Sequence, residues 1–158
     1  MVSFWRKIVY NISISIEKQE NDMRILFDSK QLAYKDPFGT LTPGQECTLH
    51  IRIPTTVRAT GVECLIALEN GTHALTACLT LEETRGAYDI FKGSFRLQKA
   101  GLYFYYFRIL TQAGSFRLFK QGDDTNMEAG DLWQISCIPE TFHTPDWAKG
   151  GLIYQVFP

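Results

Sequence analysis

The sequence predicts an all-β domain built as an antiparallel β-sandwich, and three observations predict it. Short runs in which apolar and polar residues alternate follow one another from Met23 to Cys137, as they do in strands that are buried on one face. Turns rich in glycine, proline and asparagine separate these runs. None of the runs keeps the period of about 3.6 residues that marks an amphipathic helix. Many short strands joined by such turns are typical of sandwiches.

The first strands are predicted in the N-terminal third of the chain. Isoleucines at positions 12, 14 and 16 alternate with polar residues, and a polar stretch follows up to Asp22. Residues 1–22 therefore form an N-terminal extension, which is either an added edge strand or a sequence upstream of a domain that starts at Met23. Residues 48–53 alternate again, and Pro54 ends that strand because proline has no amide proton to donate.

The middle of the chain predicts a hairpin and a third strand beside it. Residues 62–68 alternate until Asn70-Gly71, which is a strong signal for a tight hairpin turn. Residues 75–81 carry the return strand. After a turn that ends in glycine, residues 88–97 form a further strand that is rich in aromatic side chains.

Residues 102–110 predict the central strand of the domain. This segment is apolar or aromatic on both faces, which is typical of a strand that is covered on both sides. One face would meet the second sheet, and the other would be covered by a part outside this chain or left open for a ligand. Strands at 115–120 and 133–137 complete the set.

Composition and charge exclude several classes of protein. The 158 residues suit one domain, and a hydrophobic content of 45% is enough to form a core. Sixteen basic residues face seventeen acidic ones and form no basic run, so no nucleic-acid partner is expected. No apolar stretch is long enough to span a bilayer, so no membrane association is expected either.

Cysteine usage indicates structural thiols. The four cysteines are Cys47, Cys64, Cys78 and Cys137. None forms a Cys-x-x-Cys pair, and no histidine lies at zinc-ligand spacing from them, so we expect neither a metal nor a redox site. Free buried thiols favour a reducing compartment. Because no small-x-small cleavage site follows the N-terminal apolar run, the sequence predicts a cytoplasmic protein.

One acidic loop is a candidate calcium site. Asp123-Asp124, Glu128 and Asp131 lie in a segment flanked by glycines. These residues lack the spacing of an EF-hand loop, and the sequence therefore favours a solvated loop over a metal site.

The tail breaks the strand pattern. Thr144-Pro145-Asp146 resembles a helix cap with proline at the first helical position. After two glycines, residues 152–157 form a nearly continuous apolar run, which suits a strand of a parallel sheet that is buried on both faces. No partner strand follows it. We therefore expect residues 141–158 to be a linker and the opening strand of a truncated α/β domain.

These segments resemble the α-amylase family, glycoside hydrolase family 13. The tail Thr144-Pro-Asp-Trp-Ala-Lys-Gly-Gly-Leu-Ile-Tyr-Gln-Val-Phe-Pro158 resembles the junction into the catalytic barrel of that family, with Val156 in place of the usual isoleucine. Three upstream segments resemble the N-terminal domain of neopullulanase-like and maltogenic-amylase-like members. They are the turn at 33–39, the aromatic strand at 101–109 and Trp-Gln-Ile-Ser at 133–136.

The resemblance implies an immunoglobulin-like sandwich at 23–140, followed by a (β/α)8 barrel that begins within 141–158. It implies a retaining parent enzyme, whose aspartate nucleophile and glutamate acid/base lie on later barrel strands. Any calcium ligands of the parent also lie there, so we expect no catalytic residue, metal site or cofactor in this chain. The chain would be a non-catalytic domain that packs on its own barrel, with Trp147 pinning the linker, or that supports a homodimer.

The alternative function is a carbohydrate-binding module for starch or maltodextrin. Sugars stack their apolar face on exposed aromatic rings, and polar side chains then take the hydroxyls. The candidate rings are Tyr88, Phe91, Tyr103, Tyr105 and Trp133. The competing interpretation places these rings in the core or against the barrel, because large aromatic residues dominate protein cores.

Overall fold

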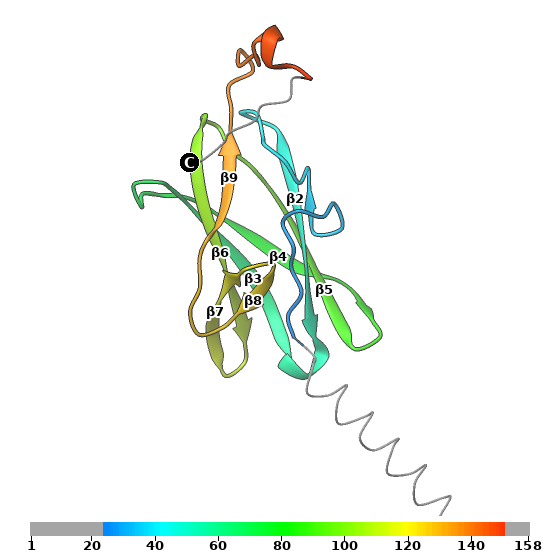
Figure 1. Cartoon of the computed structure of the whole chain (residues 1–158). Coiled ribbons are helices and arrows are strands. Elements are labelled where there is room, and N and C mark those ends of the chain that lie inside the picture. Colours follow the sequence, from blue (N-terminus) through cyan, green and yellow to red (C-terminus); the bar gives the residue numbers. More distant parts are fainter. Residues whose placement is uncertain (1–23, 151–158) are drawn as a thin grey trace, which may run out of the picture.

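A computed structural model describes residues 24–150 (Figure 1). The strands in chain order are β1 (Lys35–Asp36), β2 (Glu46–Pro54), β3 (Ala59–Leu68), β4 (His73–Arg85), β5 (Tyr88–Arg96), β6 (Gly101–Thr111), β7 (Gly114–Gln121), β8 (Asp124–Asn126) and β9 (Trp133–Cys137). Two short 3-10 turns, η1 (Thr55–Val57) and η2 (Asp146–Ala148), are the helical elements in this part of the chain. The domain is therefore all-β, as predicted.

The strands form two antiparallel layers that share β4. Sheet A contains β1, β2, β5 and the C-terminal half of β4. Sheet B contains the N-terminal half of β4 with β3, β6, β7 and β9, and β8 continues it beyond β7. β4 pairs with β3 up to Leu79 and with β5 from Thr80 onward. One continuous path of strands therefore curls into a sandwich.

The curl brings β5 very close to β4 at Gly93. A Cβ atom at this position would lie 2.5 Å from the carbonyl oxygen of Cys78 and 3.0 Å from the side chain of Leu79. A residue without a side chain is therefore needed where the sheet turns its corner.

β6 is the centre of sheet B, as the sequence predicted. It pairs with β3 along most of its length, with β9 over its first half and with β7 over its second half. Tyr105 is opposite Trp133 of β9, whereas Phe107 is opposite Leu118 of β7. β7 and β9 therefore diverge from each other beside the middle of β6.

Alternate residues of each strand enclose one hydrophobic core between the two layers. On β6 the inward side chains are Tyr103, Tyr105, Phe107 and Ile109. Cys47, Cys64 and Cys137 are also buried there as free thiols, whereas the expectation of a buried thiol is wrong for Cys78, which is exposed.

An N-terminal strap, Arg24–Gln31, crosses the open side of the sandwich (Figure 1). Leu26 and Arg52 of β2 exchange two backbone hydrogen bonds of 2.8 and 3.1 Å. On the other side, the Thr125 hydroxyl of β8 donates to the carbonyl oxygen of Ile25 at 2.6 Å. Between these contacts Phe27 enters the core and is only 4% exposed. The strap therefore ties sheet A to the β8 end of sheet B.

The predicted strands correspond to β2 to β7 and β9, whereas the short strands β1 and β8 and the strap were not predicted. The isoleucine run at 12–16 and the apolar run at 152–157 lie outside the described residues. Within 24–150, no helix has the length and apolar character needed to cross a membrane.

A buried lysine holds the turn that follows β1. Lys35 is 1% exposed, and its Nζ donates to the carbonyl oxygens of Pro37 at 2.7 Å, Phe38 at 3.1 Å and Gly39 at 3.0 Å. Three acceptors match the three protons of an ammonium group. Burial lowers the pKa of Lys35 from its ordinary value, because removal from water disfavours the charged form.

Replacement of Lys35 by methionine is expected to lower the free energy of unfolding by about 1–3 kcal/mol, because three carbonyl oxygens lose their donor. Urea denaturation measures this change. Lys99→Met is the matched control, since Lys99 is exposed, and it should change stability by no more than about 0.5 kcal/mol. Equal stability of Lys35→Met and the wild type would show that the clamp contributes nothing.

Candidate binding surfaces

The aromatic residues predicted to stack on sugar lie mostly in the core. Phe91, Tyr103, Tyr105 and Trp133 are between 0% and 4% exposed, and Tyr88 is half-buried at the start of β5. A ring with no accessible face cannot stack on a ligand. The prediction of a sugar platform is therefore wrong for the four buried rings, and the competing core interpretation describes their positions.

These rings pack against one another. Tyr105 stacks on Trp133 with centroids 5.7 Å apart and planes inclined by 24°. Phe27 from the strap meets Phe107 edge-on at 4.7 Å and Trp133 at 5.2 Å. Tyr103 donates its hydroxyl proton to the carbonyl oxygen of Lys99 at 2.8 Å. The cluster therefore stabilises the fold at the junction of the strap, β6 and β9.

The outer face of sheet A is polar, and its side chains pair across strands. Arg96 contacts Glu46 at 2.9 Å and Lys92 contacts Glu82 at 2.8 Å. The hydroxyls of Thr48 and Ser94 lie 3.0 Å apart. A polar face of this kind is suited to exposure to solvent.

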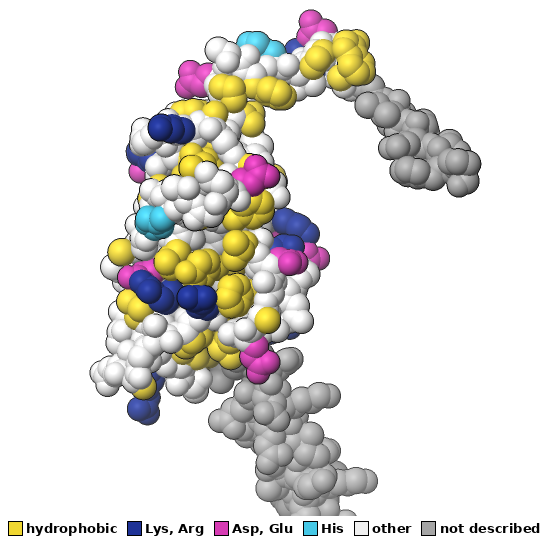
Figure 2. All heavy atoms as spheres, turned by 90° about the vertical axis from the view of Figure 1, so that its left-hand side faces the viewer, with side chains coloured by type: hydrophobic (Ala, Val, Ile, Leu, Met, Phe, Trp, Pro, Cys, Tyr) yellow, Lys and Arg dark blue, Asp and Glu magenta, His cyan; other side chains and the backbone are white. Residues whose placement is uncertain are grey.

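The outer face of sheet B is apolar, in contrast. We call it the aromatic face and define it by the half-buried side chains of Leu65, Leu102, Phe104, Tyr106 and Phe119. Tyr106 is opposite Leu65 of β3, and its ring stacks on that of Phe119 of β7 with centroids 5.9 Å apart. Figure 2 looks onto the side of the molecule that lies at the left of Figure 1, and it shows hydrophobic side chains gathered there around basic ones.

Two arginines form a cationic centre on the aromatic face. Arg108 of β6 and Arg117 of β7 are directly opposite each other in the register. The Arg108 Nε donates to Glu63 at 2.5 Å. The Arg117 guanidinium instead lies 5.6 Å from the centroid of the Tyr106 ring and has no carboxylate partner among the described residues. The face therefore carries an uncompensated positive charge within an apolar surface.

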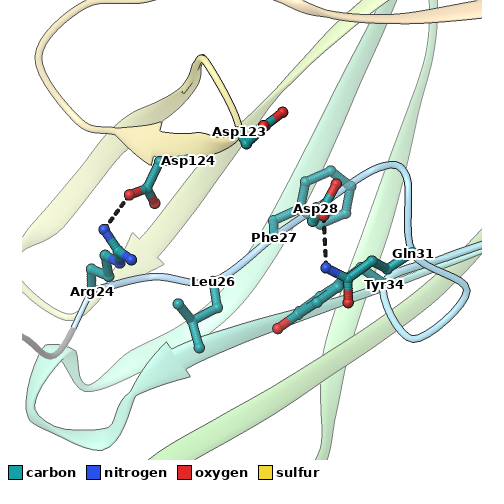
Figure 3. A pocket seen from close by; sticks show the side chains of 8 residues that line it. All are labelled: Arg24, Leu26, Phe27, Asp28, Gln31, Tyr34, Asp123 and Asp124. Carbon is teal, nitrogen blue, oxygen red and sulfur yellow. Dashed lines mark hydrogen bonds and ion pairs between the residues drawn. The ribbon is translucent and has the colours of Figure 1, made fainter.

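A pocket of about 340 Å³ opens between the strap and the turn before β8 (Figure 3). Asp123 contacts Lys30 of the strap at 2.5 Å, and Asp124 pairs with Arg24. Inside the strap, Gln31 donates to Asp28 at 2.7 Å. The ion pairs of Asp123 and Asp124 therefore join the turn before β8 to the strap. In residues 24–150 no group of three histidine, cysteine or acidic side chains is placed to hold a metal ion.

A second hollow, the β7–β9 pocket, opens where β7 and β9 diverge and has a volume of about 650 Å³. Phe104 of β6 and Gln134 of β9, which are opposite each other in the register, lie on its lining. Lys120 and Asp131 also line this pocket, and they exchange two backbone hydrogen bonds of 2.9 Å. The neighbouring Gly130 allows this approach, because a Cβ atom there would collide with the carbonyl oxygen of Lys120.

Sequence reasoning missed Phe104 and Gln134 as surface residues. Their signal was present, because Phe104 alternates with the inward Tyr103 and Tyr105 on the strand that was described as apolar on both faces. Either Tyr103 and Tyr105 or Phe104 and its alternate neighbours could face outward, depending on which side of β6 the second sheet covers. The sequence alone does not show which side is covered.

Comparison with known proteins shows a likeness in fold. No family model matches the chain, and no curated protein matches it by sequence. Among solved structures, the chain is similar to a cyclomaltodextrinase, with a TM-score of 0.51 and 18% sequence identity. The match covers 85% of this chain but 23% of the cyclomaltodextrinase. The likeness shows that the fold recurs in a part of that much longer protein.

Proposed function

We propose that the chain is a non-catalytic N-terminal domain of an α-glucan-degrading hydrolase of family 13, and that it packs on the catalytic barrel through the aromatic face. The contrast between the two outer faces carries this proposal. Sheet A presents paired charges to water, whereas sheet B presents a continuous surface of half-buried rings and leucines. Contiguous apolar surfaces of this kind mark contacts with other protein surfaces.

Two further observations support the proposal. The fold is similar to part of a cyclomaltodextrinase, and the tail from Thr144 to Pro158 resembles the junction that leads into a family 13 barrel. The segment after β9 also exposes large apolar side chains, with Phe142 at 59% and Trp147 at 79%. Such side chains are suited to pinning this segment to a neighbouring domain.

The cationic centre favours a barrel over a second copy of this chain. A two-fold interface centred on this face would bring the unpaired Arg117 against the Arg117 of the second copy, because a symmetric interface joins the same patch to itself. Like charges brought together on desolvation oppose association. A different surface that supplies a carboxylate to Arg117 avoids this repulsion, and a homodimer through the aromatic face is therefore the weaker alternative.

The reading frame beyond Pro158 tests the family assignment. It is expected to continue with Asp-Arg-Phe and to encode a (β/α)8 barrel that carries an aspartate and a glutamate about 5–5.5 Å apart, the separation of a retaining glycosidase. A frame that encodes no such barrel would refute the assignment.

Tyr106→Ala tests the docking surface. In the parent enzyme we expect it to weaken the contact between the domains by about 2 kcal/mol, the size of an aromatic hot spot. Thermal and urea unfolding of the parent and of the isolated chain separate this loss from the cost to the domain itself. Thr48→Ala on the polar face of sheet A is the matched control. If Tyr106→Ala destabilises both proteins equally, the aromatic face is not the contact.

A further inference from the structure

We propose that Asn70-Gly71, at the tip of the β3–β4 hairpin, is a site of spontaneous covalent modification, at which Asn70 loses ammonia and becomes aspartate or isoaspartate. None of the surfaces described above includes this dipeptide. Asparagine followed by glycine holds both reactants of this change within two residues. The side-chain amide carbon is the electrophile, and the next backbone nitrogen is the nucleophile. The reaction needs water but no enzyme, and it is independent of the proposed function.

The turn leaves both residues open to solvent. Asn70 and Gly71 are exposed at the margin of the sandwich (Figure 1), and a Cβ atom built on Gly71 would meet no atom beyond its chain neighbours within 4 Å. The φ of Gly71 is +81°, the left-handed conformation that favours glycine in a hairpin loop of this kind. The missing side chain therefore serves the turn, and it also leaves the attacking nitrogen without a steric obstacle.

The electrophile is polarised in the folded turn. The Oδ1 atom of Asn70 accepts a hydrogen bond of 3.0 Å from the backbone N–H of Thr72. A donor at this oxygen stabilises the negative charge that develops there when a nucleophile adds to Cγ. Asn126 makes the same contact, since its Oδ1 accepts from the N–H of Glu128 at 2.8 Å. The residue after Asn126 is Met127, however, so a side chain flanks the backbone nitrogen that would attack there.

The nucleophile is held by one hydrogen bond. The N–H of Gly71 donates to the carbonyl oxygen of Leu68 at 2.8 Å, and this bond must open before the nitrogen can lose its proton and approach Cγ. The next bond of the hairpin, from the N–H of Leu68 to the carbonyl oxygen of Thr72 at 2.9 Å, can stay closed. Local opening of an exposed turn costs much less free energy than global unfolding. The reaction therefore belongs to the folded domain rather than to the unfolded chain.

The chemistry has two steps. In the first, the Gly71 nitrogen gives its proton to hydroxide and attacks Cγ of Asn70. The bond from nitrogen to Cγ forms, the bond from Cγ to Nδ2 breaks, and the amide group leaves as ammonia after it takes a proton from water. In the second step, water opens the resulting cyclic imide. Cleavage between nitrogen and Cγ gives aspartate, whereas cleavage between nitrogen and the backbone carbonyl carbon of Asn70 gives isoaspartate.

The products change the tip of the hairpin in two ways. Isoaspartate adds a methylene carbon to the main chain, which displaces Leu68 and Thr72 from their present pairing. Either product places a carboxylate next to that of Glu69, and like charges repel each other. The N–H of Glu69 donates to the carbonyl oxygen of Leu102 at 3.1 Å. Because Leu102 belongs to the aromatic face, the change is expected to reach the margin of the docking surface. This last consequence, unlike the reaction, rests on the proposed function.

The rate of the reaction distinguishes local opening from unfolding. Opening of the Gly71 bond alone should slow the folded chain about fivefold relative to the denatured chain, which corresponds to about 1 kcal/mol. If the Thr72 bond opens as well, the reaction should be slowed about thirtyfold, which corresponds to about 2 kcal/mol. A reaction that required global unfolding would be slowed at least about 4,000-fold, because domains are stable by about 5 kcal/mol or more.

The test is incubation of the reduced 158-residue chain in mildly alkaline buffer, below the pH at which the core thiols titrate, with and without guanidinium chloride. Digestion with an acid protease and mass spectrometry measure the conversion of each asparagine, and an isoaspartate methyltransferase labels the isoaspartate. Conversion is expected at Asn70 in the folded chain, at a rate between about fivefold and thirtyfold below that of the denatured chain. Asn126 is the internal control and should stay unconverted over the same time.

Asn70→Gln is the matched variant, because it keeps the amide but lengthens the side chain, so that ring closure is slow. It should abolish the conversion at this position. Asn70→Asp introduces the carboxylate without the added carbon, and it should shift the amide signals of the turn in ¹H–¹⁵N NMR spectra less than isoaspartate does.

Absence of conversion at Asn70 in the folded chain would overturn the proposal, whether or not the denatured chain is converted. Equal conversion of Asn126 would overturn the role of Gly71. A folded chain that is slowed by much more than about thirtyfold would need more than the tip of the hairpin to open, and this result would overturn the assignment of the reaction to the folded domain. None of these outcomes bears on docking, which Tyr106→Ala tests separately in the parent enzyme.

Discussion

Phe27→Ala is expected to lower the free energy of unfolding by about 3–5 kcal/mol, the range for loss of a buried phenylalanine. The Phe27 ring is 4% exposed and meets the rings of Tyr34, Tyr105, Phe107 and Trp133 at centroid distances between 4.7 and 6.2 Å. Its removal leaves a cavity where the strap joins both sheets. Since domains are stable by about 5–15 kcal/mol in all, the variant should be close to unfolding.

Urea denaturation followed by tryptophan fluorescence measures this loss, because Trp133 lies beside the ring. Phe38→Ala is the control, since Phe38 is 54% exposed in the loop after β1, and its effect should stay within about 0.5 kcal/mol. Phe27→Leu retains part of the volume and should fall between the two. A loss below about 1 kcal/mol for Phe27→Ala would show that the strap is not part of the cooperative core, because a buried phenylalanine costs several times more.

The strap shows where sequence reasoning reached its limit for the fold. β2 and β6 could be predicted because each alternates over many residues, and the alternation itself states which side chains are buried. The strap makes one bridge, at Leu26, and has no such period. The position of the strap is fixed by hydrogen bonds to residues distant in sequence, Arg52 and Thr125. No local sequence pattern encodes these contacts.

The candidate sites were harder to predict than the strands. The sequence described residues 102–110 as apolar on both faces, and this is how β6 lies in the sheet. It could not show that Tyr103 and Tyr105 face the core while Phe104 and Tyr106 face outward. A shift of one residue exchanges the two faces of a strand. The β7–β9 pocket depends further on where β6 changes partner, which is a property of the sheet as a whole.

The stability of the domain is expected to fall steeply between about pH 9 and pH 11. Burial raises the pKa of Cys47 from 9.0 to about 11, and it raises the pKa of the fully buried Cys64 well above 9.0. Above pH 9.0 these thiols lose their protons in the unfolded chain but keep them in the folded one. Deprotonation therefore lowers the free energy of the unfolded state relative to the folded state as the pH rises. For Cys47 alone, a difference of two pKa units corresponds to about 2.7 kcal/mol.

Cys64 acts in the same direction as Cys47, while Lys35 acts against both. The folded state gives up the Lys35 proton at a lower pH than the unfolded state, because burial lowers the pKa of this group from 10.5. In the pH range just below 10.5 the unfolded chain therefore binds more protons at this residue, and stability rises with pH there. Burial also raises the pKa of Cys137 and of Tyr105, which act in the same direction as Cys47 and Cys64. With these groups opposing one lysine, the net effect remains a loss, and Lys35→Met should make the alkaline loss steeper.

Urea denaturation of reduced protein at about pH 8 and about pH 11, on either side of the thiol titration, measures the loss. Cys47→Ala should remove about 2.3 kcal/mol of the pH dependence between these two pH values, whatever its cost to stability at neutral pH. Cys78→Ala is the control, because Cys78 is exposed and should leave the slope unchanged. If Cys47→Ala and the wild type lose the same free energy between the two pH values, the Cys47 thiol is accessible to ionisation in the folded state. The core around β2 and β3 would then open to solvent at alkaline pH without global unfolding.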